Sequence, residues 1–200
     1  MPTDFQTPRS IKVETAHYVI RSVDTADAQE GWCDWLLDPH AQRMLNAPAR
    51  RMTLDEIRAY ITGFDRKTSH LLGIFEKDSG RIVGLRVVYV DPVHKEYLVN
   101  ILIGEPDARG RGARRETRFA MHNFMFEELG LEAARCNVLA DNSEMLGVLA
   151  ANGWAHEHTS TKPRADGAGI TEIHHFRLTR DVWRTTQADR ARHDQQRAVR

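Results

Sequence analysis

The stretch IGEPDARGRGARRETRFAMHNFMFEELGL, residues 103–131, joins an expected strand to an expected helix through a loop rich in glycine and arginine. We expect the strand to end near Ile103 and the helix to begin near Arg114. A helix N-terminus carries unpaired N–H groups and about half a positive charge, so it attracts anions. Gly110 and Gly112 lack a Cβ atom, which lets a phosphate group come close to the backbone.

Arginines cluster around these two glycines: Arg109, Arg111, Arg114 and Arg115. Guanidinium groups match phosphate oxygens, so the loop suits a ligand with several phosphates better than a merely solvated turn does. Two other phosphate motifs fit less well. GRGARR lacks the third glycine of a dinucleotide fingerprint, and Ala113 and Arg114 stand where a P-loop has Lys followed by Ser or Thr.

The composition of the chain limits its classes of partner. In 200 residues, 28 basic side chains balance 28 acidic ones, so no overall field attracts nucleic acid or membrane. No apolar run is long enough to span a bilayer, and the polar N-terminus lacks a signal-peptide core. We therefore expect a cytoplasmic protein with no nucleic-acid or membrane partner. Cys33 and Cys136 match no metal or redox spacing and are expected to be free thiols.

Apolar periodicity and turn residues predict an α+β fold around one mostly antiparallel sheet. The expected strands are residues 16–23, 70–77, 81–90, 96–104, 133–140, 154–161 and 169–179. The expected helices are 25–38, 53–64, 114–129 and 143–153, of which 53–64 opens with the capping-box pair Thr53 and Glu56. We expect an N-terminal arm at 1–15, one domain at 16–182 and a polar, disordered tail at 183–200.

The segment VLADNSEMLGVLAANGW, residues 138–154, provides a second motif. Together with ARGRGARRE, residues 108–116, it resembles the GNAT superfamily of acyl-CoA-dependent N-acyltransferases. The phosphate loop of that family reads Arg or Gln, two residues, Gly, one residue, then Gly or Ala. Here Arg109 and Gly112 match, whereas Arg114 occupies the last small position.

The second family signature runs from an Asn through a short helix to Gly-Phe, eleven residues on. Asn142 and Gly153 have that separation, with Trp154 in place of Phe. The resemblance spans roughly residues 16–180, and its N-terminal part is similar to the branch that includes ribosomal-protein N-terminal acetyltransferases. It implies a splayed central sheet flanked by helices, and an acetyltransferase that uses acetyl-CoA as co-substrate and no metal.

The resemblance also implies where the coenzyme binds. The pyrophosphate is expected on the loop Arg109, Gly110, Arg111, Gly112, Ala113 and Arg114. The pantetheine arm is expected to pair with the backbone of Ile101, Leu102 and Ile103 in the manner of an added strand. Asn142 would contact the pantetheine or the leaving thiol, and Asn also suits a helix N-cap. The acceptor would be a primary amine of a small molecule or a protein, and a homodimer stays an open alternative.

The catalytic groups are less clearly marked than the coenzyme loop. Glu96 is the nearest carboxylate to the expected base position, and Tyr97 and Asn142 are the other candidates, although Glu96 also suits an exposed strand end. The family positions for a Tyr or Ser proton donor hold Leu149 and Met145. Either the thiolate leaves unaided, another group supplies the proton, or the domain is an acyl-CoA sensor with weak or no activity.

Histidines in the closing hairpin raise a separate possibility of zinc binding. The four are His156, His158, His174 and His175. Because adjacent residues of a strand point to opposite faces, at most three of them converge. We therefore expect no metal.

Overall fold

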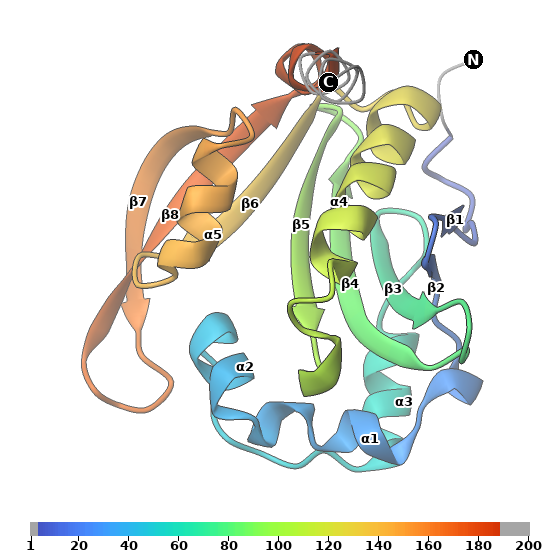
Figure 1. The fold of residues 1–200 in the computed structure, drawn as a ribbon, viewed down its shortest axis with the longest axis vertical. Coiled ribbons are helices and arrows are strands. Elements are labelled where there is room, and N and C mark those ends of the chain that lie inside the picture. Colours follow the sequence, from blue (N-terminus) through green and yellow to red (C-terminus); the bar gives the residue numbers. More distant parts are fainter. Residues whose placement is uncertain (1–3, 189–200) are drawn as a thin grey trace, which may run out of the picture.

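The computed structural model describes residues 4–188 of the chain, and its central feature is one open sheet. Within that range the sheet has eight strands in the order β1-β2-β3-β4-β5-β6-β8-β7 (Figure 1). Every neighbouring pair is antiparallel except β5 with β6. The predicted α+β fold with a mostly antiparallel sheet is therefore confirmed.

The strands are β1 (Lys12–Glu14), β2 (Tyr18–Ser22), β3 (Ser69–Glu76), β4 (Ile82–Asp91), β5 (Glu96–Ile103), β6 (Ala133–Leu139), β7 (Ala155–Pro163) and β8 (Ile170–Thr179). The α-helices are α1 (Glu30–Cys33), α2 (Pro39–Leu45), α3 (Leu54–Thr62), α4 (Ala113–Asn123) and α5 (Ser143–Ala150). Residues 180–188 are also helical. A π-helical turn, Phe124–Glu128, continues α4.

The sheet splays between its two parallel strands. β5 pairs with β6 only over Glu96–Leu98, which lie opposite Ala133–Arg135. Beyond that point β5 stays on β4 up to Ile103, while β6 follows β8 to Leu139. The two halves of the sheet therefore form a V that opens toward the C-terminal end of β5 (Figure 1). This confirms the splay that the family resemblance implied.

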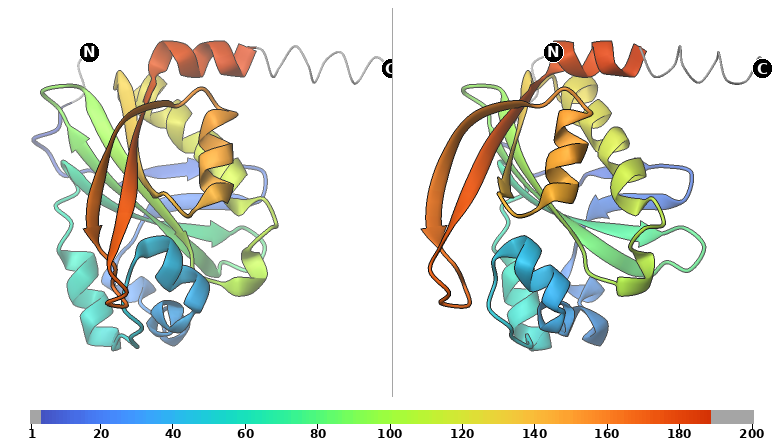
Figure 2. Two further views of the ribbon diagram at one scale, coloured as in Figure 1. Left: turned by 90° about the vertical axis from the view of Figure 1, so that its left-hand side faces the viewer. Right: turned by 60° about the vertical axis from the view of Figure 1, so that its left-hand side comes forward.

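Helices cover the two faces of the sheet unequally. On one face α4 and the π-helical turn after it bury Met121 and Met125 in one cluster with Leu72 and Tyr97. On the other face α3 packs Ile57 and Ile61 against the first half of the sheet only. Figure 2 shows α4 and α5 on one side and α3 on the opposite side. The second half of the sheet, β6 to β7, has no α-helix of residues 4–188 across that opposite face.

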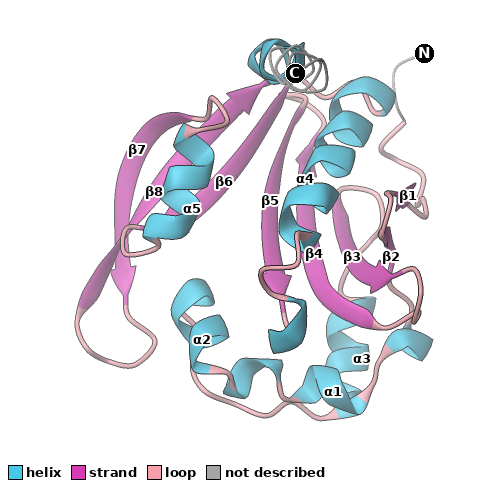
Figure 3. Ribbon diagram, viewed as in Figure 1, coloured by secondary structure: helices cyan, strands magenta, loops and turns pink. Residues whose placement is uncertain are grey.

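The helix expected over 25–38 is replaced by three short helical segments, which are a 3-10 turn at Thr25–Asp27, α1, and a 3-10 turn at Trp35–Leu37 (Figure 3). Trp32 and Trp35 are both buried and stack with ring centroids 5.5 Å apart. The indole of Trp35 also donates to Glu105 (2.9 Å), a partner far along the chain that holds this segment away from one straight helix. A further helix, α2, starts at Pro39 with Asp38 as its N-cap; it was not expected from the sequence.

Both ends of the chain contribute more structure than expected. β1 lies within the expected arm, and Ile11 before it is only 2% exposed. At the other end, Trp183 is 1% exposed and its indole N–H donates to the side-chain oxygen of Asn123 on α4 (3.0 Å). Residues 183–188 therefore pack on the domain instead of forming a loose tail. Residues 189–200 of that expected tail lie outside the described part.

Candidate functional site

A cavity of about 540 Å³ occupies the opening between β5 and β6. Its walls are the diverging edges of the two strands, the loop before α4, the start of α5, and one side of α2. The residues predicted to bind coenzyme that line it are Ile101, Leu102, Ile103, Arg109, Gly110, Gly112, Ala113, Arg114 and Asn142. Arg111 is exposed and does not line it, whereas Arg115 does.

The loop before α4 has the backbone that its glycines suggested. Gly110 and Gly112 have φ angles of +75° and +87°, a region that side chains with a Cβ rarely adopt. No described atom lies within 4 Å of a Cβ built on either glycine, so the loop surface is open. Gly112 is the N-cap of α4 and supplies no side-chain cap. The first N–H groups of this helix can therefore meet an anion.

Arg109 does not extend from this loop toward the cavity as a free guanidinium. Its Nε and Nη2 donate to the carbonyl oxygens of Ile103 and Gly104, both at 3.1 Å. It also forms an ion pair with Asp38. Burial alone would raise the pKa of Asp38, but Arg109 and the N–H of His40 hold that pKa below its usual value. In this arrangement Arg109 fixes the loop to the end of β5 and to α2.

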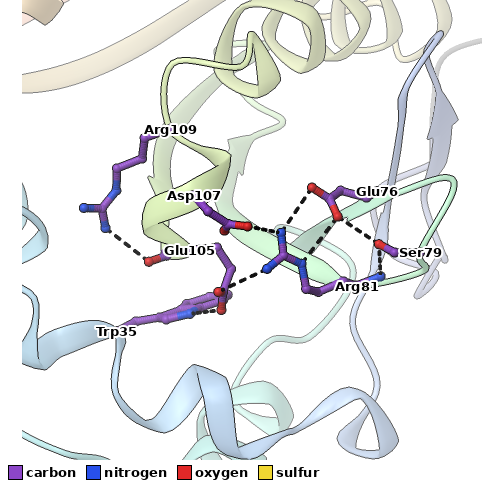
Figure 4. A network of polar contacts seen from close by, with 8 residues as sticks. Trp35, Glu76, Ser79, Arg81, Glu105, Asp107 and Arg109 are labelled. Atoms are coloured by element: carbon purple, nitrogen blue, oxygen red, sulfur yellow. Dashed lines mark hydrogen bonds and ion pairs between the residues drawn. The ribbon is translucent and has the colours of Figure 1, made fainter.

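A polar network braces the same loop from its outer side (Figure 4). The guanidinium of Arg81 contacts Asp107 at 2.9 Å and Glu105 at 3.6 Å. Its hydrogen bonds to Asp107, then those to Glu76, raise the pKa of Arg81. Glu105 in turn accepts the indole N–H of Trp35 (2.9 Å). The loop is thus held before any ligand binds, which favours preorganised anion binding.

The other basic groups of the loop differ in availability. Arg114, in the position that the family motif gives to a small residue, is ion-paired with Glu144 of α5. Arg115 is exposed and lines the cavity, so its guanidinium is accessible to a ligand. Arg115 is one of the loop arginines, but it was not among the residues predicted to bind the coenzyme.

Asn142 lies at the opposite wall of the cavity. Its side-chain oxygen accepts the N–H of Met145 (3.1 Å), so it is the N-cap of α5. It also lines the cavity, which leaves its amide NH2 group for a ligand. The two roles that the sequence suggested for Asn142 are therefore compatible in one geometry.

Glu96 and Tyr97 lie outside this cavity, at the end of β5 that is still paired with β6. Both oxygens of Glu96 are engaged, one by Arg177 at 2.7 Å and the other by Arg135 at 2.9 Å. Tyr97 is 2% exposed and hydrogen-bonded to Nδ1 of His122; burial raises the pKa of Tyr97 well above its usual value. Their catalytic roles stay predictions, and Tyr97 has no access to the 540 Å³ cavity.

A second cavity of about 300 Å³ lies where the strands begin to diverge, and Glu96 and Tyr97 line it. Its other walls come from β4, β6, β7 and β8 and include His158, His175 and Glu157. Asn137 of β6 lines both cavities, so the two are neighbours at the splay. These hairpin residues come close to β5 only through the strand order β6-β8-β7, for which the sequence has no local signal.

Several residues that line the cavity were not predicted from the sequence. His40, Met44 and Leu45 come from α2, the helix that was not expected. Asp38 followed by Pro39 is an N-cap and N1 signal that could have identified it. Cys136 also lines the cavity, but burial raises its pKa to about 12, so its thiol is a weak nucleophile.

The hairpin histidines pair with each other across β7 and β8. The rings of His158 and His175 stack with centroids 4.1 Å apart, and the hydroxyl of Thr159 lies within 3.0 Å of both His156 and His174. Among residues 4–188, no group of three or more His, Cys, Asp or Glu is arranged to hold a metal ion. None of the helices described over that range is long and apolar enough to cross a bilayer.

Comparison with solved structures identifies proteins of the same fold. An acetyltransferase of the GNAT family from Bacillus anthracis has a TM-score of 0.70 at 14% identity, over 84% of this chain and 98% of that one. The ribosomal-protein-S5-alanine acetyltransferase from Vibrio fischeri has a TM-score of 0.71 at 14% identity, over 86% and 98%. The spermidine N-acetyltransferase from Vibrio cholerae, solved with CoA and spermine, has 0.72 at 12%, over 83% and 97%.

At these identities the likeness concerns the fold alone. No curated protein sequence matches this chain. A family model does match: the acetyltransferase (GNAT) domain model covers residues 17–155, more than half of the chain. The splayed sheet, the glycine-arginine loop at the start of α4 and this match lead to one conclusion: the chain belongs to the GNAT acetyltransferase family.

Proposed function

We propose that this protein transfers an acetyl group from acetyl-CoA to a primary amine. The observation that carries the proposal is the cavity between β5 and β6, with an uncapped helix N-terminus at one end and an unpaired strand edge along its wall. Those two features suit the two chemically different parts of acetyl-CoA. The diphosphate needs anion-binding N–H groups, and the peptide-like pantetheine needs backbone partners.

In the proposed complex the diphosphate lies on Gly110, Gly112 and Ala113, with Arg115 as the free guanidinium. The pantetheine lies along Ile101–Ile103, because β6 leaves the edge of β5 beyond Leu98. This brings the thioester toward the splay, where the amide of Asn142 faces the cavity. That a protein of the same fold was solved with CoA and spermine supports the choice of donor and the class of acceptor.

The reaction then follows from the chemistry of a thioester. The neutral amine attacks the carbonyl carbon, and backbone N–H groups near Leu102 or Ile103 stabilise the oxyanion. The C–S bond breaks, and the thiolate takes the second amine proton to leave as the CoA thiol. Leu149, at one family position for a proton donor, is fully buried, and Met145 occupies the other. We therefore propose that the thiolate leaves without a side-chain acid.

A second candidate is an acyl-CoA-binding module without turnover. The pairing of Arg114 with Glu144, in a position where the family motif has a small residue, favours it, as does the missing donor. Both candidates predict coenzyme binding; only the transferase predicts amine-dependent release of free CoA.

The test is calorimetric titration of CoA and acetyl-CoA into the wild type and two matched variants. Gly112→Val places a branched side chain at φ +87° in the proposed diphosphate site. Gly167→Val creates the same kind of strain at φ +75° in the β7–β8 loop, away from the cavity. We expect Gly112→Val to weaken binding at least tenfold, about 1.4 kcal/mol, and Gly167→Val to leave it unchanged.

Thiol release is then followed with acetyl-CoA and a panel of amines: a peptide N-terminus, a lysine peptide, a polyamine and an amino sugar. Release with any one of them supports the transferase. Tight binding without release supports the module, and equal affinity in both glycine variants would refute the proposed coenzyme site.

A further inference from the structure

The acceptor enters a transferase as an ammonium ion, and a group near the splay must take its proton before attack. The 540 Å³ cavity offers poor candidates. Its ionisable side chains are His40, Arg109, Arg114, Arg115, Cys136 and Glu144. The arginines stay protonated, Glu144 is paired with Arg114, and Cys136 has a pKa of about 12. His40, two residues after Asp38, donates its backbone N–H to that carboxylate (3.0 Å), and Asp38 pairs with Arg109, so His40 stands on the side of the coenzyme loop and not at the splay.

The second cavity holds two imidazoles at its wall. His175 of β8 lies directly opposite Asn137 of β6, the residue that lines both cavities. His158 of β7 is the register partner of His175, and their rings are parallel within 10°. The pair therefore stands on the strands next to Asn137, the residue that the two cavities share.

We propose that the His158–His175 pair accepts the proton of the acceptor ammonium, directly or through one water molecule. This inference rests on the proposed transferase function and assigns the proton acceptor of that same reaction. Nε2 of His175 lies 2.7 Å from the hydroxyl of Ser160, which fixes the ring. With Nε2–H donating to Ser160, Nδ1 carries the free lone pair. Neither nitrogen of His158 has a hydrogen-bond partner among residues 4–188.

Three carboxylates, two guanidiniums and one further imidazole surround the pair. They are Asp91 from β4, Glu96 from β5, Arg135 from β6, His156 and Glu157 from β7, and Arg177 from β8. Glu96 and Glu157 each lie within 4.0 Å of both arginines. Glu96 is therefore fully engaged, whereas the two imidazoles are not. Burial, then the neighbouring His158, lowers the pKa of His175, which favours its neutral form near pH 7.

The proposed step balances in atoms and charge. An imidazole lone pair forms an N–H bond with the ammonium proton, and the freed amine lone pair forms the N–C bond. The electrons of the C–S bond stay on sulfur, which takes the second amine proton. The imidazolium then releases its proton to water, so each turnover releases one proton net.

The test is the pH profile of kcat/KM for the amine of the panel that the wild type acetylates best. We expect the double variant His158→Gln/His175→Gln to lose about 100-fold at pH 7, because general-base catalysis contributes roughly 10²–10⁴. At a pH above the pKa of that amine in solution, about 8 for a peptide N-terminus and about 10.4 for a lysine, the loss should shrink to within about threefold. CoA affinity by calorimetry should match the wild type, which shows that the fold and the coenzyme site are intact.

Three further variants sharpen the result. His17→Gln changes an exposed histidine that lines neither cavity and is not among the groups around the pair, and should keep the wild-type profile. Ser160→Ala removes the hydroxyl that fixes His175 and should cost severalfold at pH 7 only. Glu96→Gln removes the rival carboxylate and should leave the acid side of the profile in place.

A double variant with the wild-type profile overturns the histidine assignment while the transferase stands. Loss of the acid side in Glu96→Gln, but not in the double variant, also overturns it. No turnover by the wild type with any amine of the panel refutes the transferase function and the histidine role together.

Discussion

Arg109→Ala should destabilise the folded protein more than it weakens coenzyme contacts. In the structure this guanidinium binds two backbone carbonyls and the carboxylate of Asp38, and each partner of the ion pair is less than a quarter exposed (23% and 22%). Hydrogen bonds that involve a charged group contribute about 1.5–3 kcal/mol when they are buried. Three such contacts on one side chain are not additive, because they share a single geometry.

We therefore expect Arg109→Ala to lower the free energy of unfolding by about 2–3 kcal/mol. For a domain of this size, that corresponds to a fall in Tm of about 4–12 °C. Arg111→Ala is the matched control, since Arg111 lies in the same loop, is exposed and has no hydrogen bond or ion pair to a described residue. Its effect should stay within about 0.5 kcal/mol.

The assay is urea denaturation followed by tryptophan fluorescence, at pH 7 and at pH 3. The depressed pKa of Asp38 means that the ion pair stabilises the fold above pH 4 and is lost as Asp38 is protonated at lower pH. The difference between wild type and Arg109→Ala should therefore shrink at pH 3. A double-mutant cycle with Asp38→Ala should give a coupling of about 1–2 kcal/mol. If Arg109→Ala kept wild-type stability and lost CoA affinity tenfold, the structural role of Arg109 would be refuted and a role as phosphate ligand supported.

Three other predictions concern groups outside the loop. Arg86→Met should raise the free energy of unfolding by about 1 kcal/mol or more, because Arg86 is 2% exposed and burial lowers its pKa to about 9. Among residues 4–188 it donates only to the hydroxyl of Thr117 and the carbonyl of Arg114. A lower urea midpoint would contradict this. Burial lowers the pKa of His122 and of His70, so stability should fall below about pH 6.5, by up to about 1.4 kcal/mol per pH unit for each histidine. In the double variant Tyr97→Phe/His122→Leu, the difference in the free energy of unfolding between pH 7.5 and pH 5 should shrink by the contribution of one histidine. An unchanged difference would count against this. Asn46→Gly keeps the left-handed φ of +47° but removes two hydrogen bonds to the β7–β8 loop, so proteolysis of that loop should quicken; an equal rate would speak against the contact.

The elements with a local signal were predictable. α3 begins where Thr53 and Glu56 form the expected reciprocal cap, at 3.2 and 2.8 Å. All the strands except β1 followed from their apolar runs and turn residues, and the open loop before α4 followed from glycines that need positive φ angles. These features are determined by residues only a few positions apart, so they can be recognised in the sequence itself.

The features that were missed depend on residues far apart in the chain. Trp35 bends its segment because its indole reaches Glu105, seventy residues later. Glu96 looked like a free carboxylate until β6 and β8 brought two arginines to it. Arg109 is predicted as a phosphate ligand, and the ion pair with Asp38, at the start of α2, had no signal in the sequence. In each case the residue is visible in the sequence, but its partner is brought close by the tertiary fold, and no local pattern identifies that partner.

The unexpected helix α2 also accounts for how the splay is held open. Its N-terminus is tied to the β5 side through Asp38 and Arg109. Its C-cap, Asn46, bonds the carbonyl of Pro163 and the N–H of Ala165 on the β7–β8 side, at 2.9 and 2.8 Å. A helix of seven residues anchored to both arms of the V limits how far they can close or part. The width of the cavity therefore depends on these two polar contacts as well as on the strands that line it.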